Sequence, residues 1–406
     1  MTSTAIVQQR PNVTVTALLA GFAALAPLSI DMFLPAVPKL SAELTATPAQ
    51  STATVSVFLA GVALGQLLAG PFSDRVGRRA PVIGGLAVFL AGAIMAAVAP
   101  SVEVLLAARL AQALGASSVS VTGRAIVRDL FDHRGVANFL STLALISGLA
   151  PVLAPAGGTA VLGAFGWRAI FLCTAVIGAI LLVGAALRLP ESRSAEAEAD
   201  ARARHPFATL VILLKNRRLL AYLLGAAFNS AGFFTYLASA PLVIMKSYAV
   251  APAMFSGVIA MNAVGLVGAS QLNRLLLRRF SPDAVLKAMS VASLINALAF
   301  GGLAITGAGG LPALLVLVFA AVSSTSIVQA NTMAGALSVD PRRAGSIAAL
   351  FGAAGFAAGT VASMIAGALY DGSERAMATV IGVSLAGVAI ALRAITRRGT
   401  AAQRPA

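Results

Sequence analysis

The sequence has little charge, and this shortage limits what the chain can be. Charged residues make up 11% of its 406 residues, whereas 59% are hydrophobic. A soluble domain is nearer half apolar and a quarter charged. The composition therefore excludes an ordinary soluble domain and predicts an all-α, polytopic membrane protein.

Cysteine and histidine are nearly absent. The one cysteine, Cys173, lies in an apolar run, so the chain has no disulfide framework. The two histidines, His133 and His205, lie in polar segments and indicate no His-based metal site. We therefore expect neither a cofactor nor a bound metal ion.

Long apolar runs dominate the sequence instead. Twelve of them reach the length of about 20 residues that a membrane-spanning helix needs. Backbone groups in lipid must bond within their own segment, so each run is predicted to be a helix. The predicted spans are 14–36, 50–72, 80–99, 102–123, 135–163, 167–188, 219–241, 254–275, 285–307, 310–332, 343–369 and 377–396.

One long polar stretch, residues 189–218, separates the sixth span from the seventh. Its centre is charged and rich in alanine, which is typical of a linker. The chain is therefore predicted to contain two six-helix halves, residues 1–188 and 219–406. Glycine-rich stretches recur on the fifth and eleventh spans, as expected of parallel repeats with a substrate site between them.

The 29 cationic residues are divided unevenly between the two sides of the membrane. With the N-terminus inside, the outer loops hold only Lys39, Arg168, Lys246 and Arg375, while Arg109 lies within a span. The positive-inside rule therefore predicts that both termini are cytoplasmic. The net charge of +15 is spread over many segments rather than gathered on one face, so we expect no nucleic-acid partner.

Asp31 is a carboxylate within the first span. Inserting such a charge costs about 2.5–3.5 kcal/mol, so we expect it to face a wet cavity, have a partner or carry a proton. Arg109 lies on the antiparallel fourth span at a similar depth, roughly 10 Å from the outer end against roughly 8 Å for Asp31.

If these two helices are neighbours, the charges of Asp31 and Arg109 can meet. A change in their separation would then switch Asp31 between holding and releasing a proton. The alternatives are a static ion pair that fixes helix packing and, for Arg109 alone, snorkelling to the outer surface.

The loop after the second span carries the most specific pattern, formed by Gly70, Asp74, Arg75, Gly77, Arg78 and Arg79. It resembles the loop between helices two and three of the major facilitator superfamily. The resemblance implies the twelve-helix major facilitator fold, with this gating loop latching the two halves on the cytoplasmic side. A simple topology signal is the alternative interpretation.

The fifth span carries a second pattern, formed by Gly148, Pro151, Pro155, Gly157 and Gly158. It resembles the helix motif of drug/proton antiporters, although Ala154 stands where that motif has glycine. Prolines break the helical ladder and small residues permit close packing, so this helix can bend and slide. Simple close packing is the alternative.

Four further stretches, 30–36, 109–112, 124–129 and 166–171, together resemble the Bcr/CflA branch of bicyclomycin and chloramphenicol resistance exporters. The resemblance is strongest in the N-terminal half. It implies a monomeric, multi-pass protein of the bacterial inner membrane that exports small amphipathic drugs in exchange for protons.

Cavity residues are predicted from position and type. Asn229, Phe233 and Tyr236 share one face of the seventh span, and aromatic walls with few polar anchors suit amphipathic drugs. The other polar or aromatic candidates are Phe33, Gln112, Asn262, Gln329 and Asn331. Ordinary helix packing is the alternative for each of them.

Three other functions have to be weighed. A facilitator or proton symporter of a small metabolite would use the same fold. An enzyme in the membrane would need a catalytic dyad or a metal cluster, which Asp31 and Arg109 do not supply, so we expect no enzyme. A receptor or scaffold would be revealed by the absence of flux.

Overall fold

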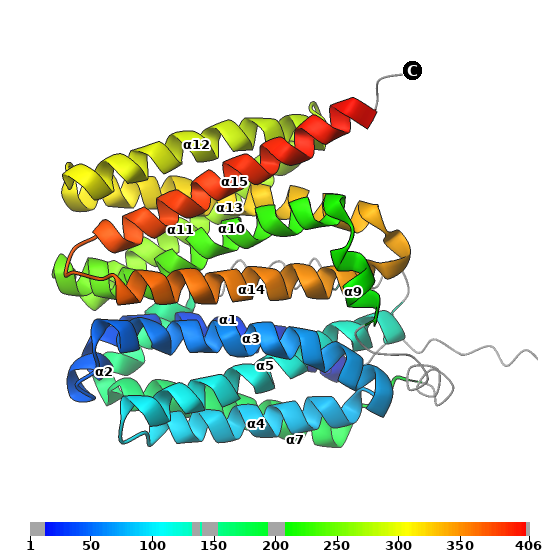
Figure 1. Cartoon of the computed structure of the whole chain (residues 1–406). Coiled ribbons are helices and arrows are strands. Elements are labelled where there is room, and N and C mark those ends of the chain that lie inside the picture. The colour runs from blue at the N-terminus through cyan, green and yellow to red at the C-terminus, as the bar shows by residue number, and fades with distance from the viewer. Residues whose placement is uncertain (1–12, 132–138, 140–152, 194–207, 403–406) are drawn as a thin grey trace, which may run out of the picture.

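The computed structural model describes residues 13–131, 139, 153–193 and 208–402. Every regular element among these residues is helical (Figure 1). The elements are α1 (Val13–Asp31), η1 (Leu34–Ala36), α2 (Val37–Glu43), α3 (Pro48–Val76), α4 (Arg79–Ala97), α5 (Val102–Leu130), α7 (Trp167–Arg188), α9 (Ala208–Leu214), α10 (Arg217–Ala240), η2 (Pro241–Ser247), α11 (Pro252–Leu276), α12 (Pro282–Thr306), α13 (Gly310–Val339), η3 (Pro341–Arg343), α14 (Ala344–Ala368) and α15 (Arg375–Ala402).

Within the described residues, 11 helical segments are long and apolar enough to cross a membrane. They coincide with eleven of the predicted spans, and most of their ends differ from the prediction by only a few residues. The remaining predicted span, 135–163, lies partly outside the described residues, and its described part is an apolar helix, Leu153–Phe165. The predicted all-helical membrane architecture is confirmed to this extent.

Two spans change helix type near their predicted ends. After Asp31 the chain makes a 3-10 turn through Pro35 and continues as α2, and after Ala240 it continues as the π-helix η2, which begins at Pro241. Proline lacks the N–H that the α-helical ladder needs, which explains why the helix type changes at both places. The predicted linker also contains a short helix, α9, because residues 208–214 are mostly apolar.

Capping side chains explain where several spans begin and end. Thr47 and Gln50 form a capping box ahead of α3, and Ser101 and Ser281 cap α5 and α12. Each cap satisfies an N–H that would otherwise lack a partner at the helix start. Gly77 ends α3 with a φ of 87°, in the region that glycine adopts without steric cost.

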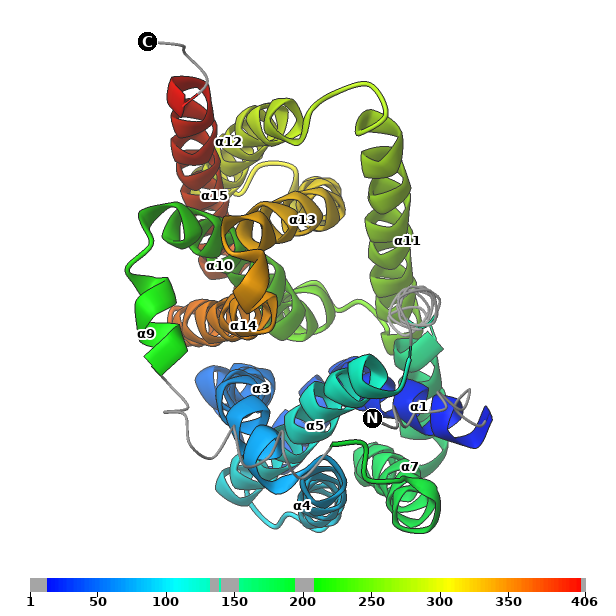
Figure 2. The same cartoon turned by 90° about the vertical axis from the view of Figure 1, so that its right-hand side faces the viewer.

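The described helices form two bundles (Figure 2). One contains α1, α3, α4, α5 and α7, and the other contains α10 to α15. The most extensive contact between the bundles joins α3 to α14. Gly367 and Gly352 on α14 lie directly against the side chains of Thr52 and Gln66 on α3, and such small residues let helices approach closely.

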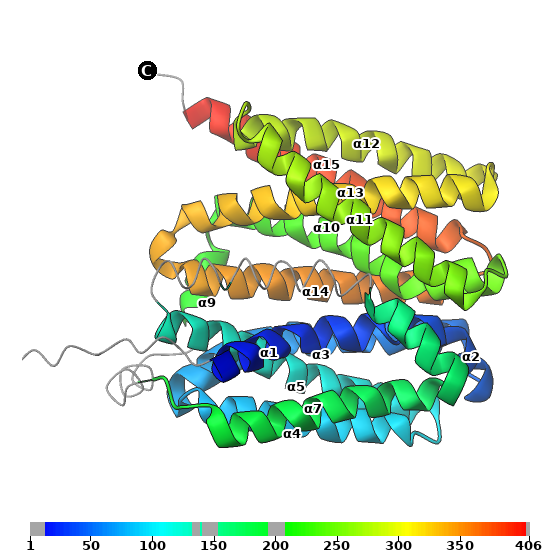
Figure 3. The ribbon, with the colours of Figure 1, turned by 180° about the vertical axis from the view of Figure 1, so that it is seen from behind.

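The two ends of the molecule differ in charge and in contacts. We call the end with the α3–α4 loop, Arg128 and Arg193 the basic end, and the end with α2 and η2 the opposite end (Figures 1 and 3). At the opposite end α2 contacts η2 across the two bundles. Two hydroxyl pairs also join the bundles in this part of the molecule, Ser56 with Ser363 and Thr159 with Ser256, each with 2.7 Å between oxygens.

Candidate functional site

Asp31 is the last residue of α1, where the helix gives way to the turn through Pro35. Its side chain is buried, with 6% of the residue exposed. Among the described residues no hydrogen bond or ion pair engages its carboxylate. A buried carboxyl group without a partner is costly as an anion, so the site suits a carboxyl group that gains and loses a proton.

Arg109 on α5 is fully buried and held mainly by main-chain carbonyl groups. Its Nε donates to the carbonyl of Thr54 at 3.2 Å, and its Nη1 donates to the carbonyl of Ser29 at 3.0 Å and to Oε1 of Gln112 at 2.8 Å. Gln112 is oriented in turn by Thr174, to which its Nε2 donates at 3.3 Å. The guanidinium group is therefore fixed by α1, α3 and α5 together.

Three aromatic rings surround the Arg109 guanidinium. Its carbon lies 4.2 Å from the ring centre of Phe58, 4.8 Å from that of Phe33 and 5.8 Å from that of Phe171. Such cation–π contacts stabilise a charge that has left water. Phe33 and Gln112, which we expected in a substrate cavity, are both fully buried against Arg109 instead.

Asp31 and Arg109 lie on helices that pack together, as the predicted encounter requires, because α1 contacts α5. They form no ion pair in this arrangement. Nη2 of Arg109 has no hydrogen-bond partner among the described residues, although it is buried. The structure thus holds an arginine with a free donor on one helix and a carboxyl group with free acceptors on a helix that contacts it.

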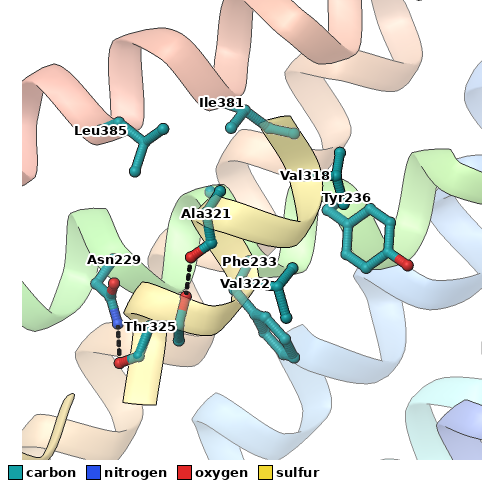
Figure 4. Close-up of a pocket in the computed structure, with 10 residues that line it drawn as sticks. Asn229, Phe233, Tyr236, Val318, Ala321, Val322, Thr325, Ile381 and Leu385 are labelled. Carbon is teal, nitrogen blue, oxygen red and sulfur yellow. Dashed lines mark hydrogen bonds between the residues drawn. The ribbon is translucent and has the colours of Figure 1, made fainter. Parts of the chain in front are cut away.

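A small cavity in the C-terminal bundle collects the three predicted residues of α10 (Figure 4). Asn229, Phe233 and Tyr236 line it together with apolar residues of α13 and α15. Asn229 donates from Nδ2 to the carbonyl of Thr325 at 3.3 Å and to Oε1 of Gln329 at 3.4 Å. The cavity is therefore mainly apolar with one amide at its edge.

The remaining predicted cavity residues lie in two places. Asn262 on α11 donates to the Tyr236 hydroxyl at 2.7 Å and so belongs to the same region. Asn331 lies apart, because its Nδ2 donates to Oδ1 of Asn273 at 2.8 Å and to the carbonyl of Ile327 at 2.9 Å. The first bond joins α13 to α11, and the second closes a turn of α13. Asn331 therefore has a packing role in this arrangement.

The gating loop forms an ion network at the basic end. Arg78, of which 3% is exposed, donates to Asp74 at 2.8 Å, to Asp129 of α5 at 2.9 Å and to Ser73 at 2.9 Å. Arg193, which follows α7, donates to Asp74 at 3.0 Å. Burial lowers the pKa of Arg78, but its bonds to the two carboxylates outweigh this effect and raise it. These bonds tie α3, α5 and the chain after α7 into one unit.

The other predicted residues of the loop support this unit. Gly77 provides the reversal between α3 and α4, and Arg79 donates to the carbonyl of Ala186 on α7 at 2.6 Å. Arg75 lies in the last turn of α3, and Gly70 lies within α3 with open space around it.

Glu191 is a further member of this network, which the sequence placed in the linker. Its carboxylate accepts from the main-chain N–H groups of Arg78 and Arg79 at the start of α4, and from those of Ser192 and Arg193. Burial raises the pKa of Glu191, but these four donors outweigh it and hold the pKa below the ordinary value. An acidic residue next to a helix start is a recognisable signal, but the helix it caps is remote in sequence.

The predicted antiporter motif lies partly outside the described residues, which exclude Gly148 and Pro151. In the described part, the carbonyl of Pro155 accepts a hydrogen bond from Ser256 of α11 at 3.2 Å. Gly158 lies against the main-chain carbonyl of Met32, whereas Gly157 has open space around it. This helix therefore contacts both the residue after Asp31 and the other bundle.

Among the described residues, no cluster of three or more His, Cys, Asp or Glu side chains could hold a metal ion. What the arrangement offers chemically is a buried carboxyl group without a partner among the described residues, an arginine with a free donor and a mainly apolar cavity.

Comparison with known proteins identifies relatives that match most of the chain. The family model of the Major Facilitator Superfamily matches residues 19–363. An uncharacterized MFS-type transporter of Bacillus subtilis, YdgK, is 32% identical over 355 residues, which covers 86% of this chain and 87% of the relative. A bicyclomycin resistance protein homolog of Haemophilus influenzae is 28% identical over 338 residues, covering 83% and 84% respectively.

A third relative matches a shorter part. The multidrug resistance protein MdtL of Shigella dysenteriae is 32% identical over 237 residues, which covers 58% of this chain and 60% of that protein. Among solved structures, the xylose transporter XylE of E. coli in a partially occluded inward open conformation covers 93% of this chain and 96% of its own, with a TM-score of 0.69. Its 15% identity supports a common fold and nothing finer.

Proposed function

This chain belongs to the Major Facilitator Superfamily, and we propose that it is a proton-coupled antiporter that exports small amphipathic drugs. Its family makes it a membrane transporter and not an enzyme. The drug class is supported by the names of two relatives, a bicyclomycin resistance protein homolog and a multidrug resistance protein. The mainly apolar lining of the cavity beside Asn229 is chemically suited to amphipathic substrates.

The membrane arrangement is part of the proposal. The predicted span 135–163 is the twelfth, both termini lie in the cytoplasm, and the basic end faces the cytoplasm according to the positive-inside rule. The two halves are residues 1–188 and 219–406, joined by the linker 189–218. The protein works as a monomer in the bacterial inner membrane.

The environment of Asp31 is the observation that supports the proposed proton coupling. It is buried, it has no partner among the described residues, and a fixed arginine with a free donor lies on the neighbouring helix. A static ion pair would instead need Asp31 and Arg109 to be bonded to each other. Movement of α1 relative to α5 would bring the carboxylate to Arg109 and release its proton.

Alternating access requires the halves to part at one end while they close at the other. In this arrangement the opposite end is joined by the Thr159–Ser256 and Ser56–Ser363 pairs. The basic end carries the ion network of Asp74 and Arg78, which the proposal assigns to gating.

The experiment that tests the proposal measures drug accumulation in bacteria that express the chain, with ethidium, chloramphenicol and bicyclomycin as probes. We expect lower accumulation than in cells with Asp31→Asn protein, and we expect an uncoupler to abolish the difference. Export that persists in the presence of the uncoupler would favour a facilitator. Proton-dependent uptake of a metabolite without drug export would favour a symporter.

A second measurement separates coupling from structure. The double variant Asp31→Asn with Arg109→Gln should remain unable to drive uphill export. Recovery of proton-driven export at the wild-type rate by this double variant would show that neither residue carries the proton.

A further inference from the structure

Tyr236 is a buried tyrosine of the C-terminal half whose hydroxyl accepts a hydrogen bond but donates none to the described residues. Of the residue, 3% is exposed, and its oxygen accepts a hydrogen bond from Asn262 at 2.7 Å. Among the described residues, no acceptor takes the hydroxyl proton. Its ring lines the cavity, but its hydroxyl points away from the other lining residues, towards the blue ribbons of the N-terminal half (Figure 4).

The region of the N-terminal half on that side is the one around Asp31, the last residue of α1. Three contacts bring these regions together. The turn η1, just after Asp31, contacts α11, which carries Asn262. The carbonyl of Met32 lies against Gly158, and the next residue, Thr159, is bonded to Ser256 of α11.

We propose that Tyr236, oriented by Asn262, is the residue of the C-terminal half that binds the ionised carboxylate of Asp31 and thereby joins the two halves. The inference rests on the proposed antiport function and adds the group that responds to the protonation state of Asp31. A charged carboxylate is a stronger acceptor than the neutral acid, so the bond holds the opposite end closed mainly when Asp31 has lost its proton.

This bond would meet a requirement of proton-coupled antiport. An empty, deprotonated transporter must not reorient, because that step would dissipate the gradient. The Asp31–Tyr236 bond keeps this species closed at the opposite end. A drug that enters beside Asn229 and Phe233 competes for Tyr236, and a proton on Asp31 weakens the acceptor, so only the loaded species move freely.

Other charged and titratable groups lie on the elements packed around this region. Arg109 is a buried charge on the contacting helix α5, and its free Nη2 is the competing donor within the N-terminal half. On the packed elements α2, α7 and η2, the cations at the opposite end are Lys39, Arg168 and Lys246, which are exposed. The carboxylate of Glu43 on α2 accepts from Trp167 and Arg168, and Arg188 ends α7 at the basic end. The thiol of Cys173 is a further titratable group on α7.

The experiment follows the opposite end directly and needs no substrate. Spin labels are attached at Lys39→Cys and Lys246→Cys, on the contacting elements α2 and η2, in a Cys173→Ser background. The distance distribution of the purified, drug-free protein is measured as a function of pH. We expect the ratio of closed to open protein to fall about tenfold as Asp31 becomes protonated, which is the lower range for a hydrogen bond to a charged group.

Four variants test whether the pH response depends on Asp31 and Tyr236. Asp31→Asn should remove the pH response, and Tyr236→Phe, which deletes one hydroxyl, should remove it equally. Tyr222→Phe is the matched control, because it deletes another buried tyrosine hydroxyl from the same helix, α10, and should respond as wild type does. Asn262→Ala keeps the Tyr236 hydroxyl but loses its orientation, so a smaller response is expected.

The proposal and the transport function fail in different ways. A wild-type pH response in the Tyr236→Phe protein, or none in the wild type, would overturn the Tyr236 assignment. Loss of the response in both tyrosine variants would make it a packing effect and overturn it as well. A chain that moves no drug but shows the expected pattern would retain the assignment and lose the drug-export proposal.

Discussion

Gly158 and Gly157 are adjacent glycines in one helix with opposite surroundings, which makes them a sharp test of how the fifth span packs. A methyl group on Gly158 would meet the main-chain carbonyl of Met32, whereas one on Gly157 would meet no atom within 4 Å. The obstacle at Gly158 is backbone, which cannot rotate away as a side chain can. We therefore expect Gly158→Ala to displace α1 next to Asp31 and Gly157→Ala to displace nothing.

The size of the difference follows from two terms. Replacing glycine by alanine within a helix stabilises it by about 0.5–1 kcal/mol, and this gain applies to both variants. Overpacking at Gly158 costs about 1–3 kcal/mol, and it applies to that variant alone. The common gain cancels, so the free energy of unfolding of Gly158→Ala should lie about 1–3 kcal/mol below that of Gly157→Ala.

The assay compares thermal unfolding of the two purified variants with that of wild type, together with drug efflux at equal expression. We expect Gly157→Ala to be at least as stable as wild type and to transport normally. Gly158→Ala should melt several degrees lower and lose most of its efflux, because Met32 directly follows Asp31, the proposed proton site. Equal melting temperatures and equal efflux for the two variants would refute this account of the contact.

Three further predictions concern single carboxylates. Asp31→Asn should insert and fold, since no ion pair is broken in this arrangement, but purified protein should no longer release protons when ethidium is added; undiminished proton release would contradict it. Asp74→Asn, which weakens bonds to Arg78 and Arg193, should impair efflux at normal expression, whereas Asp340→Asn, which weakens a surface pair with Arg343, should not. Glu191 has a lowered pKa, so its stabilisation is complete at neutral pH and is lost as the pH falls through that pKa. Glu191→Gln should therefore cost up to about 1 kcal/mol at neutral pH, and its unfolding curve should converge with that of wild type in acid; a gap that persists in acid would contradict this.

The contacts of Glu191 illustrate what a linear pattern cannot supply. The residue follows the sixth span directly, and composition alone assigns it to a polar linker. Its carboxylate nevertheless accepts from the start of α4, more than a hundred residues earlier. Only the packing of α4 against α7 brings the two together, and no periodicity in the sequence encodes that distance.

Arg109 shows the same limit inside the membrane. Its isolation among apolar residues marked it as functional, and its depth matched that of Asp31. The sequence could not indicate that its donors would go to the carbonyls of Ser29 and Thr54, because main-chain acceptors carry no residue signature. The predicted partner, Asp31, lies on a contacting helix but is not bonded to it.

Composition and hydropathy were enough to predict the class of protein and most of its helices, and they singled out Asp31 and Arg109 as charges within the spans. Lipid forces every spanning segment to satisfy its own backbone, so length and hydropathy are enough to predict a helix. Tertiary structure decided which of those helices touch, and therefore that Asn229, Phe233 and Tyr236 share a cavity while Phe33 and Gln112 close around Arg109. The reason is that apolar helices in a bilayer have no hydrophobic preference for one another, so their contacts depend on close packing and on a few hydrogen bonds between residues far apart in the chain.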